Sequence, residues 1–232
     1  MLSVIIPTYN EEVGIRALLQ GLRAQAPECD LIVADGSSSD ATAALAEPYA
    51  RVVVTPANRG LQLNRGVRSA RGDALLFLHA DVEFPPDGLA AIERALSDPA
   101  VVGGNFTLEF SGDGFPSRIL TFIDRSRRRF GVFYGDSGIF VRREVFERLG
   151  GFREWPVLED YDFARRLVRA GKTVCLPQVV RVSSRRWNGR LLQTMAVWFF
   201  IQLLYFLRVP PAWLARWYRP VRESSTPQRP AA

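Results

Sequence analysis

Histidine, lysine and cysteine are scarce in this chain of 232 residues, which has one histidine (His79), one lysine (Lys172) and two cysteines (Cys29 and Cys175). Two distant cysteines without CxxC spacing argue against a disulfide framework or a zinc site and favour a reducing, cytoplasmic compartment. The net charge of +6 therefore comes almost wholly from arginine, whose planar guanidinium suits phosphate. Because no recognised nucleic-acid-binding motif appears, we expect an anionic partner that is not nucleic acid.

We also expect neither a signal peptide nor a second folding unit. "MLSVIIPTYN" has a short apolar run, no basic flank and an early Pro7, so we interpret it as the first strand. With 47% hydrophobic and 23% charged residues, the chain has ordinary globular composition, and its length suits one sizeable domain.

The first hundred residues alternate short β-rich runs with helical patterns, which is typical of βαβ units around a parallel sheet. We expect Pro7 to end the first strand. The predicted strands are 2–6, 30–35, 51–55 and 74–80, and the predicted helices begin near 12, 41 and 61. After Pro99 the pattern changes, and we expect an α+β extension at the edge of the sheet. Its predicted elements are a strand at 101–110, a helix at 115–130, a short strand at 138–141 and a helix at 162–171.

A nearly continuous apolar segment, 191–207, lies between Arg190 and Arg208. Its length is at the lower limit for a membrane span, so we favour a buried or interface-lying helix, in contact with a membrane surface or a second copy of the chain. We expect one domain at 1–190, an apolar helical segment at 191–219 and a disordered tail at 220–232.

Acidic residues follow three of the predicted strands. Glu11, Asp35 and Asp81 would meet where the carboxyl ends of parallel strands meet, which is where ligands bind in open α/β sheets. Glu11 and Asp35 could instead cap helices, and Asp81 could cap a turn. A divalent cation that bridges phosphates needs only one or two protein ligands, so Asp81 is a candidate ligand, with His79 beside it or as a buried core residue.

Two further groups could take part in chemistry. Glu159 and Asp160 precede a predicted helix, where acids stabilise the N-terminus, but a carboxylate there could also serve as a general base. Arg185, Arg186 and Trp187 could be a solvated face or could hold a pyrophosphate and a sugar. "GDSG" at 135–138 is similar to the nucleophile turn of trypsin-like proteases, but that fold is all-β, so we interpret it as a turn.

Taken together, "SVIIPTYNEE", "VADGSSSD", "LLFLHAD", "YGDSGIFVRREVFERLGGF" and "LEDYDFARRL" resemble a family 2 inverting glycosyltransferase of the nucleotide-diphospho-sugar (GT-A) type, in order from residue 2 to about 190. "SSRRW" and the apolar C-terminal segment further resemble a bacterial subgroup linked with radical-SAM and arsenosugar biosynthesis. The fold that this resemblance implies is α/β, a mainly parallel Rossmann-like sheet flanked by helices, with a C-terminal apolar helix.

The resemblance also implies roles for individual residues. Asp160 would be the catalytic base, and Asp81 would bind Mg²⁺ or Mn²⁺ as the last residue of the family's DxD motif, whose first position is His79 here. Phosphate or acceptor contacts would come from Glu159, Arg185, Arg186 and Trp187. The donor would be a UDP- or GDP-linked sugar, the acceptor is unknown, and the nucleotide would contact Pro7, Tyr9, Glu11, Asp35 and Asn64.

Two other functions share the predicted sheet. A nucleotidyltransferase would need a basic phosphate loop after the first strand, where "PTYNEE" is acidic. A non-catalytic sugar-nucleotide binder, docked on a membrane or partner enzyme through 191–207, would bind donors without hydrolysis or transfer.

Overall fold

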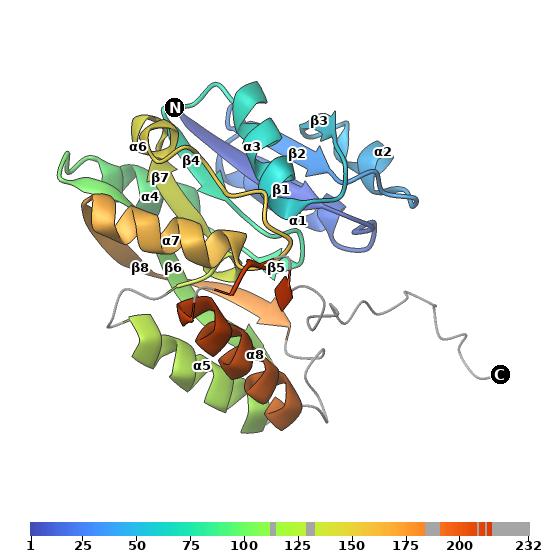
Figure 1. The fold of residues 1–232 in the computed structure, drawn as a ribbon. Helices are drawn as coiled ribbons and strands as arrows, with labels where there is room; N and C mark the ends of the chain where they lie inside the picture. Colours follow the sequence, from blue (N-terminus) through green and yellow to red (C-terminus); the bar gives the residue numbers. More distant parts are fainter. Residues whose placement is uncertain (112–114, 129–132, 184–190, 208, 212, 215–232) are drawn as a thin grey trace.

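A computed structural model describes residues 1–111, 115–128, 133–183, 191–207, 209–211 and 213–214. Its centre is one sheet of eight strands in the order β3-β2-β1-β4-β7-β6-β8-β5 (Figure 1). The strands are β1 (Leu2–Thr8), β2 (Asp30–Asp35), β3 (Arg51–Val54), β4 (Ala74–Phe77), β5 (Val82–Glu83), β6 (Val101–Ser111), β7 (Ile139–Arg142) and β8 (Lys172–Ser183).

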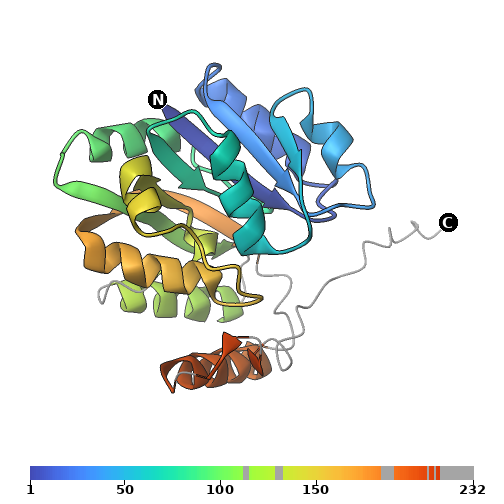
Figure 2. The ribbon, with the colours of Figure 1, turned by 45° about the horizontal axis from the view of Figure 1, so that its top comes forward.

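Helices cover both faces of this sheet (Figures 1 and 2). They are α1 (Ile15–Gln25), α2 (Thr42–Ala46), α3 (Arg59–Ser69), α4 (Gly88–Leu96), α5 (Phe115–Arg128), α6 (Arg143–Arg148), α7 (Glu159–Ala170) and α8 (Leu191–Phe206), with a 3₁₀ turn, η1 (Gly135–Ser137). Alternate residues of β1 divide the core between the faces. Val4 and Ile6 pack with α1 and α4, whereas Ile5 packs with α3, α6 and α7.

The first four strands to be predicted are all present and run parallel, but three of their ends differ from the prediction: β3 ends one residue early, at Val54, and β1 and β4 differ by more. β1 continues through Pro7, which pairs in register with Ala34. Proline is tolerated there because β4 ends opposite Ile5, so no ladder partner needs the missing N–H on that side. β4 ends at Phe77 rather than at residue 80, which places His79 in the loop that follows the strand.

The second half extends the same sheet beyond β4, with β7 antiparallel to both β4 and β6. The long strand β8, which the sequence pattern did not predict, runs parallel to β6. It contains Pro177, and the pairing shifts from Leu176 to Val179 at that point, so the proline sits in an irregularity of the ladder where no N–H is required.

Helix α8 confirms that the apolar segment is helical, and it lies at the lower end of the molecule in Figures 1 and 2. One side of it packs through Ile201 and Leu204 against Val157 and Leu214. Within the described ranges, none of the helices combines the length and apolar character that crossing a bilayer requires.

Candidate functional site

The first part of the candidate site is a double loop beyond the carboxyl ends of β1 and β2. Asp35 ends β2 and is buried; its carboxylate accepts hydrogen bonds from Thr8 Oγ1 (2.9 Å), Ser38 Oγ (2.6 Å) and Ser38 N–H (2.8 Å). The Glu11 N–H donates to Thr42 Oγ1 at 2.7 Å. The two acids predicted to contact a nucleotide therefore lie in one polar loop pair, and Asp35 is held rigidly by its neighbours.

Further hydrogen bonds join these two loops. Asn10, in the left-handed region with φ of 57°, accepts from the Ser39 N–H at 2.9 Å, and its own N–H donates to Ser38 Oγ. Burial by itself would raise the pKa of Asp40, but hydrogen bonds from Thr42 and from backbone N–H groups lower it. These hydrogen bonds fix the backbone of the two loops that carry Tyr9 and Glu11, so a binding surface here would be preorganised.

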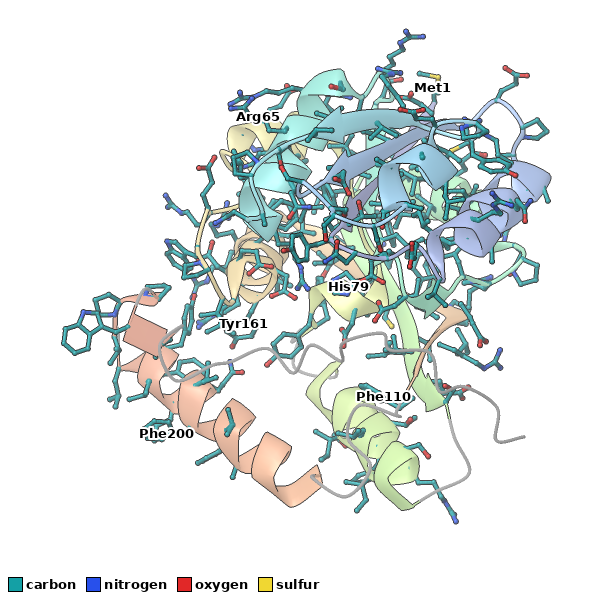
Figure 3. All side chains as sticks on the ribbon, turned by 90° about the vertical axis from the view of Figure 1, so that its right-hand side faces the viewer. Met1, Arg65, His79, Phe110, Tyr161 and Phe200 are labelled. Carbon is teal, nitrogen blue, oxygen red and sulfur yellow. The ribbon has the colours of Figure 1, made fainter. Side chains whose placement is uncertain are left out.

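The second part of the site is a cavity at the end of β4. It is lined by residues from β1, α3, β4, η1, β7 and α7 and from the loops beside them: Pro7, Arg59, Leu63, Phe77, Leu78, His79, Gly135, Ile139, Phe152 and Asp160. Figure 3 shows His79 near the middle of the molecule, between the N-terminal strands and the second half of the chain. The cavity thus joins three of the predicted site residues, Pro7, His79 and Asp160.

Asp160 is held by two backbone hydrogen bonds. Its Oδ2 accepts from the Gly135 N–H at 2.8 Å, and its Oδ1 accepts from the Tyr161 N–H at 2.7 Å. A Cβ built on Gly135 would lie 3.0 Å from Asp160 Oδ2 and 3.1 Å from His79 Nε2, so these two side-chain atoms lie within about 6 Å of each other. A carboxylate aimed by fixed donors, with a histidine nearby, can accept a proton from a bound hydroxyl.

The local fold places Asp160 at the first turn of α7. Leu158, the residue before the helix, has φ of 63°, a conformation that few non-glycine residues adopt and that persists only where packing enforces it. Phe163, on the buried face of α7, packs in an aromatic cluster with Phe77, which is followed two residues later by His79. The cluster therefore fixes α7 against the end of β4, with Asp160 and His79 on adjoining elements.

Glu159 differs from Asp160 because its side chain is buried, with 4% of the residue exposed. Desolvation raises its pKa from 4.5 to about 7; Arg59, whose Nη1 lies 3.4 Å from Oε1, opposes that shift, and the neighbouring Asp160 adds to it. Glu159 is thus a bridge between the starts of α7 and α3.

Other predicted residues occupy different surroundings. Both groups of the Asn64 amide are engaged with Phe152, donating to its carbonyl at 2.9 Å and accepting from its N–H at 3.0 Å. This pair of bonds holds the 151–152 turn against α3. Arg185, Arg186 and Trp187 lie outside the described residues, as does the predicted tail at 220–232.

Asp81 is half-buried in the loop between β4 and β5, beyond the cavity lining. In the part of the chain that the structure describes, no group of three or more His, Cys, Asp or Glu side chains is placed to hold a metal by itself. A carboxylate such as that of Asp81 suits a hard divalent cation that takes one or two protein ligands and completes its shell with phosphate oxygens and water.

Sequence reasoning missed three contributors to the site. The Gly135 N–H was interpreted only as part of a turn, although its backbone approaches Asp160 closely. Arg59 lay just before the helix predicted from residue 61, and Thr42 lay in the first turn of the helix predicted from residue 41. A glycine-flanked "GDSG" next to a strand was the one signal that could have indicated the first.

Comparison with known proteins identifies relatives of the whole sheet. The family model described as Glycosyl transferase family 2 matches residues 3–150. An undecaprenyl-phosphate 4-deoxy-4-formamido-L-arabinose transferase of Pseudomonas fluorescens (strain Pf0-1) is 28% identical over 172 residues, which are 66% of this chain and 50% of that protein. The chain spans about half the length of the curated relatives it matches, with values from 34% to 62%.

Two solved structures share the fold. Glucosyl-3-phosphoglycerate synthase from Mycobacterium tuberculosis, in complex with Mn²⁺, UDP and glucosyl-3-phosphoglycerate, has a TM-score of 0.63 at 22% identity, covering 90% of this chain and 81% of that one. A mannosyltransferase from Pyrobaculum calidifontis, in complex with GDP-Man and Mn²⁺, has a TM-score of 0.61 at 23% identity, covering 78% and 56%. The expected GT-A fold is thereby confirmed.

Proposed function

The chain belongs to glycosyl transferase family 2, and from this premise we propose that it transfers a sugar from a nucleotide-diphosphate donor to an acceptor hydroxyl with inversion of configuration. The observation that supports this most is the cavity at the end of β4, where Asp160, fixed by two backbone N–H groups, faces His79 and Pro7. Substrates of relatives guide the donor: UDP and GDP-Man are bound in the two solved structures.

Asp160 is the proposed base. The acceptor hydroxyl gives its proton to the carboxylate while its oxygen attacks the anomeric carbon opposite the departing diphosphate, so one displacement inverts that centre. The Gly135 and Tyr161 N–H groups hold the carboxylate in place, and Glu159, bridged to Arg59, fixes the start of α7. Positioning of this kind lowers the entropic part of the barrier.

Asp81, with His79, would hold a Mg²⁺ or Mn²⁺. When bound, such a cation stabilises the negative charge that develops on the leaving diphosphate. The nucleoside would lie along the double loop of β1 and β2, against Tyr9, Glu11 and Asp35, with Pro7 at its inner end. Asn64 would act indirectly, through the turn that it holds, and Arg185, Arg186 and Trp187 would add contacts to phosphate or acceptor.

The finer assignments extend this proposal. We place the transferase domain at 1–190, followed by the helical segment at 191–219 and the tail at 220–232. "SSRRW" and the apolar C-terminal segment support membership in the subgroup linked with radical-SAM and arsenosugar biosynthesis. Nucleotide-sugar chemistry and the scarcity of cysteine support a cytoplasmic location, at the inner face of the membrane.

Replacing the proposed base gives the direct test of mechanism. Asp160→Asn keeps the size of the side chain but removes the proton acceptor, so transfer should fall by roughly 10²- to 10⁴-fold while nucleotide binding stays near that of the parent. The measurement is sugar transfer or donor hydrolysis beside nucleotide titration.

Asp162→Asn is the matched control, because Asp162 lies in the same turn but pairs with Arg166 at 2.7 Å. It should retain transfer. Unchanged turnover in Asp160→Asn would exclude Asp160 as the base, and binding of donors with neither transfer nor hydrolysis in the parent would favour a non-catalytic binder.

A further inference from the structure

Helix α8 exposes an apolar face that the rest of the described chain does not cover. Phe199 is 73% exposed, Leu207 66% and Phe206 57%, and Phe200 and Leu203 are also exposed. These positions recur at helical spacing along one side of α8. Figure 3 shows Phe200 on the side of α8 that points away from the sheet. Side chains of this size exposed together are typical of an interaction surface.

The opposite side of α8 is anchored to the body of the protein. Ile201 is buried with Val157 and Leu214, and Tyr205 makes an edge contact with Tyr161 at 5.3 Å between ring centroids. Tyr134 donates a hydrogen bond to Gln202 and stacks on Tyr161 at 5.2 Å. The exposed face therefore has a fixed direction, and its anchors are the neighbours in sequence of Gly135 and Asp160.

The sequence on both sides of α8 is strongly basic. Residues 184–232 contain eight arginines and one acidic residue, Glu223, so this stretch alone carries a net charge of +7, more than the +6 of the whole chain. The same stretch contains four of the five tryptophans. Arginine and tryptophan beside an apolar helix are the residues that settle at the boundary between headgroups and acyl chains.

A second copy of the chain fits this chemistry poorly. In a two-fold symmetric dimer the same surface meets itself, so the positive charge that flanks α8 in the sequence would be doubled in one assembly. Repulsion between these like charges opposes such a pairing, whereas an anionic lipid surface attracts them. At 16 residues α8 is about 24 Å long, shorter than the roughly 30 Å hydrocarbon core, so it suits lying along the surface rather than crossing it.

We propose that the face of α8 formed by Phe199, Phe200, Leu203, Phe206 and Leu207 docks on the anionic surface of a membrane. The apolar side chains enter the headgroup boundary, and the arginines of the surrounding sequence bind lipid phosphates. This docking goes beyond the proposed transfer reaction and does not depend on it. The Gln202 and Tyr205 contacts link the docked helix to the turns that hold Asp160.

Vesicle flotation of the full chain tests the proposal, with phosphatidylcholine vesicles that contain or lack phosphatidylglycerol. The parent should float with the anionic vesicles only, and added salt should weaken the binding. Phe199→Glu should reduce the bound fraction at least about tenfold. The substitution removes a phenylalanine that docking would bury in the bilayer, and it adds a negative charge that anionic lipid repels. Val13→Glu, which adds the same charge at a side chain 86% exposed elsewhere, should bind as the parent does.

Three results would overturn the proposal. Failure of the parent to bind anionic vesicles would contradict docking, and equal binding by Phe199→Glu would place the contact elsewhere. A parent dimer that Phe199→Glu converts to a monomer, without vesicle binding, would assign the face to a second copy. Phe199 is exposed and distant in sequence from the donor loops, so Phe199→Glu should bind nucleotide as the parent does. That result would show that the variant is folded and that the loss of vesicle binding is separate from the proposed transfer function.

Discussion

At the scale of single residues, Asp160 and Glu159 show how burial gives neighbouring carboxyl groups different tasks. Asp160 is partly exposed to the cavity and bonded to two N–H groups, whereas Glu159 is enclosed and paired with Arg59. The enclosed group supports the helix start, and the partly exposed group can meet a substrate. The sequence "LED" does not show which of the two acids is buried, because the burial of each depends on how α7 packs.

Glu159→Gln should flatten the pH dependence of stability. Because the folded pKa of about 7 lies above the ordinary 4.5, the native state keeps a proton that the unfolded chain releases, so the free energy of unfolding falls as pH rises between these values. This contribution is complete below pH 4.5 and is lost as pH rises through 7. Glutamine cannot titrate, and urea unfolding at several pH values should show a smaller slope.

Glu154→Gln provides the comparison for that series, because Glu154 is exposed. Its slope should match the parent's. An equal slope in parent and Glu159→Gln would contradict the assignment of the buried proton to Glu159.

At the scale of elements, the sheet depends on close backbone approaches between β6 and its neighbours. A Cβ on Gly104 would lie 1.9 Å from the Val174 carbonyl oxygen of β8 and 2.9 Å from the Phe140 ring of β7. These contacts hold β6 close to β7 and β8, and β7 in turn pairs with β4. A side chain at Gly104 would therefore force neighbouring strands apart.

Gly104→Ala should cost more than about 2 kcal/mol of unfolding free energy, as overpacking in a rigid core does. Gly21→Ala is the matched control: Gly21 is exposed within α1 and has no atom within 4 Å of the added Cβ, so the change should stabilise by about 0.5–1 kcal/mol. Denaturant unfolding of both variants measures these effects. If Gly104→Ala were as stable as the parent, the backbones of β6 and β8 would have to lie farther apart at Gly104 than the structure places them.

The sequence predicted the parallel half of the sheet well because its elements follow local rules. Continuous apolar runs such as "LIVA" identify buried strands, and Asp35 at the end of β2 follows from that placement. β8 was missed because Pro177 interrupts its pattern, and only the long pairing with β6 makes that proline acceptable. The approach of Gly135 to Asp160 joins residues 25 positions apart, which no local pattern encodes.

At the scale of the whole molecule, the two proposals concern two separate surfaces. The polar loops and the cavity lie at the edge of the sheet beyond β1, β2 and β4. Helix α8 packs near the start of α7, and its apolar face is exposed. Tyr134 and Tyr161 lie between these two surfaces. A membrane-docked α8 would hold the Asp160 end of the cavity, where we propose that the acceptor binds, near the lipid surface, with the donor loops facing water.

The measurement that tests the central claim most directly is thermal unfolding of the full chain with UDP, GDP, dTDP and their sugars, each with and without Mn²⁺. A nucleotide at 100 times its dissociation constant should add about 2.7 kcal/mol, which for a chain of this size raises Tm by several degrees. We predict such a shift with one nucleotide, larger with Mn²⁺, and loss of the Mn²⁺ effect in Asp81→Ala. The absence of a shift with every nucleotide, with and without Mn²⁺, would contradict the account.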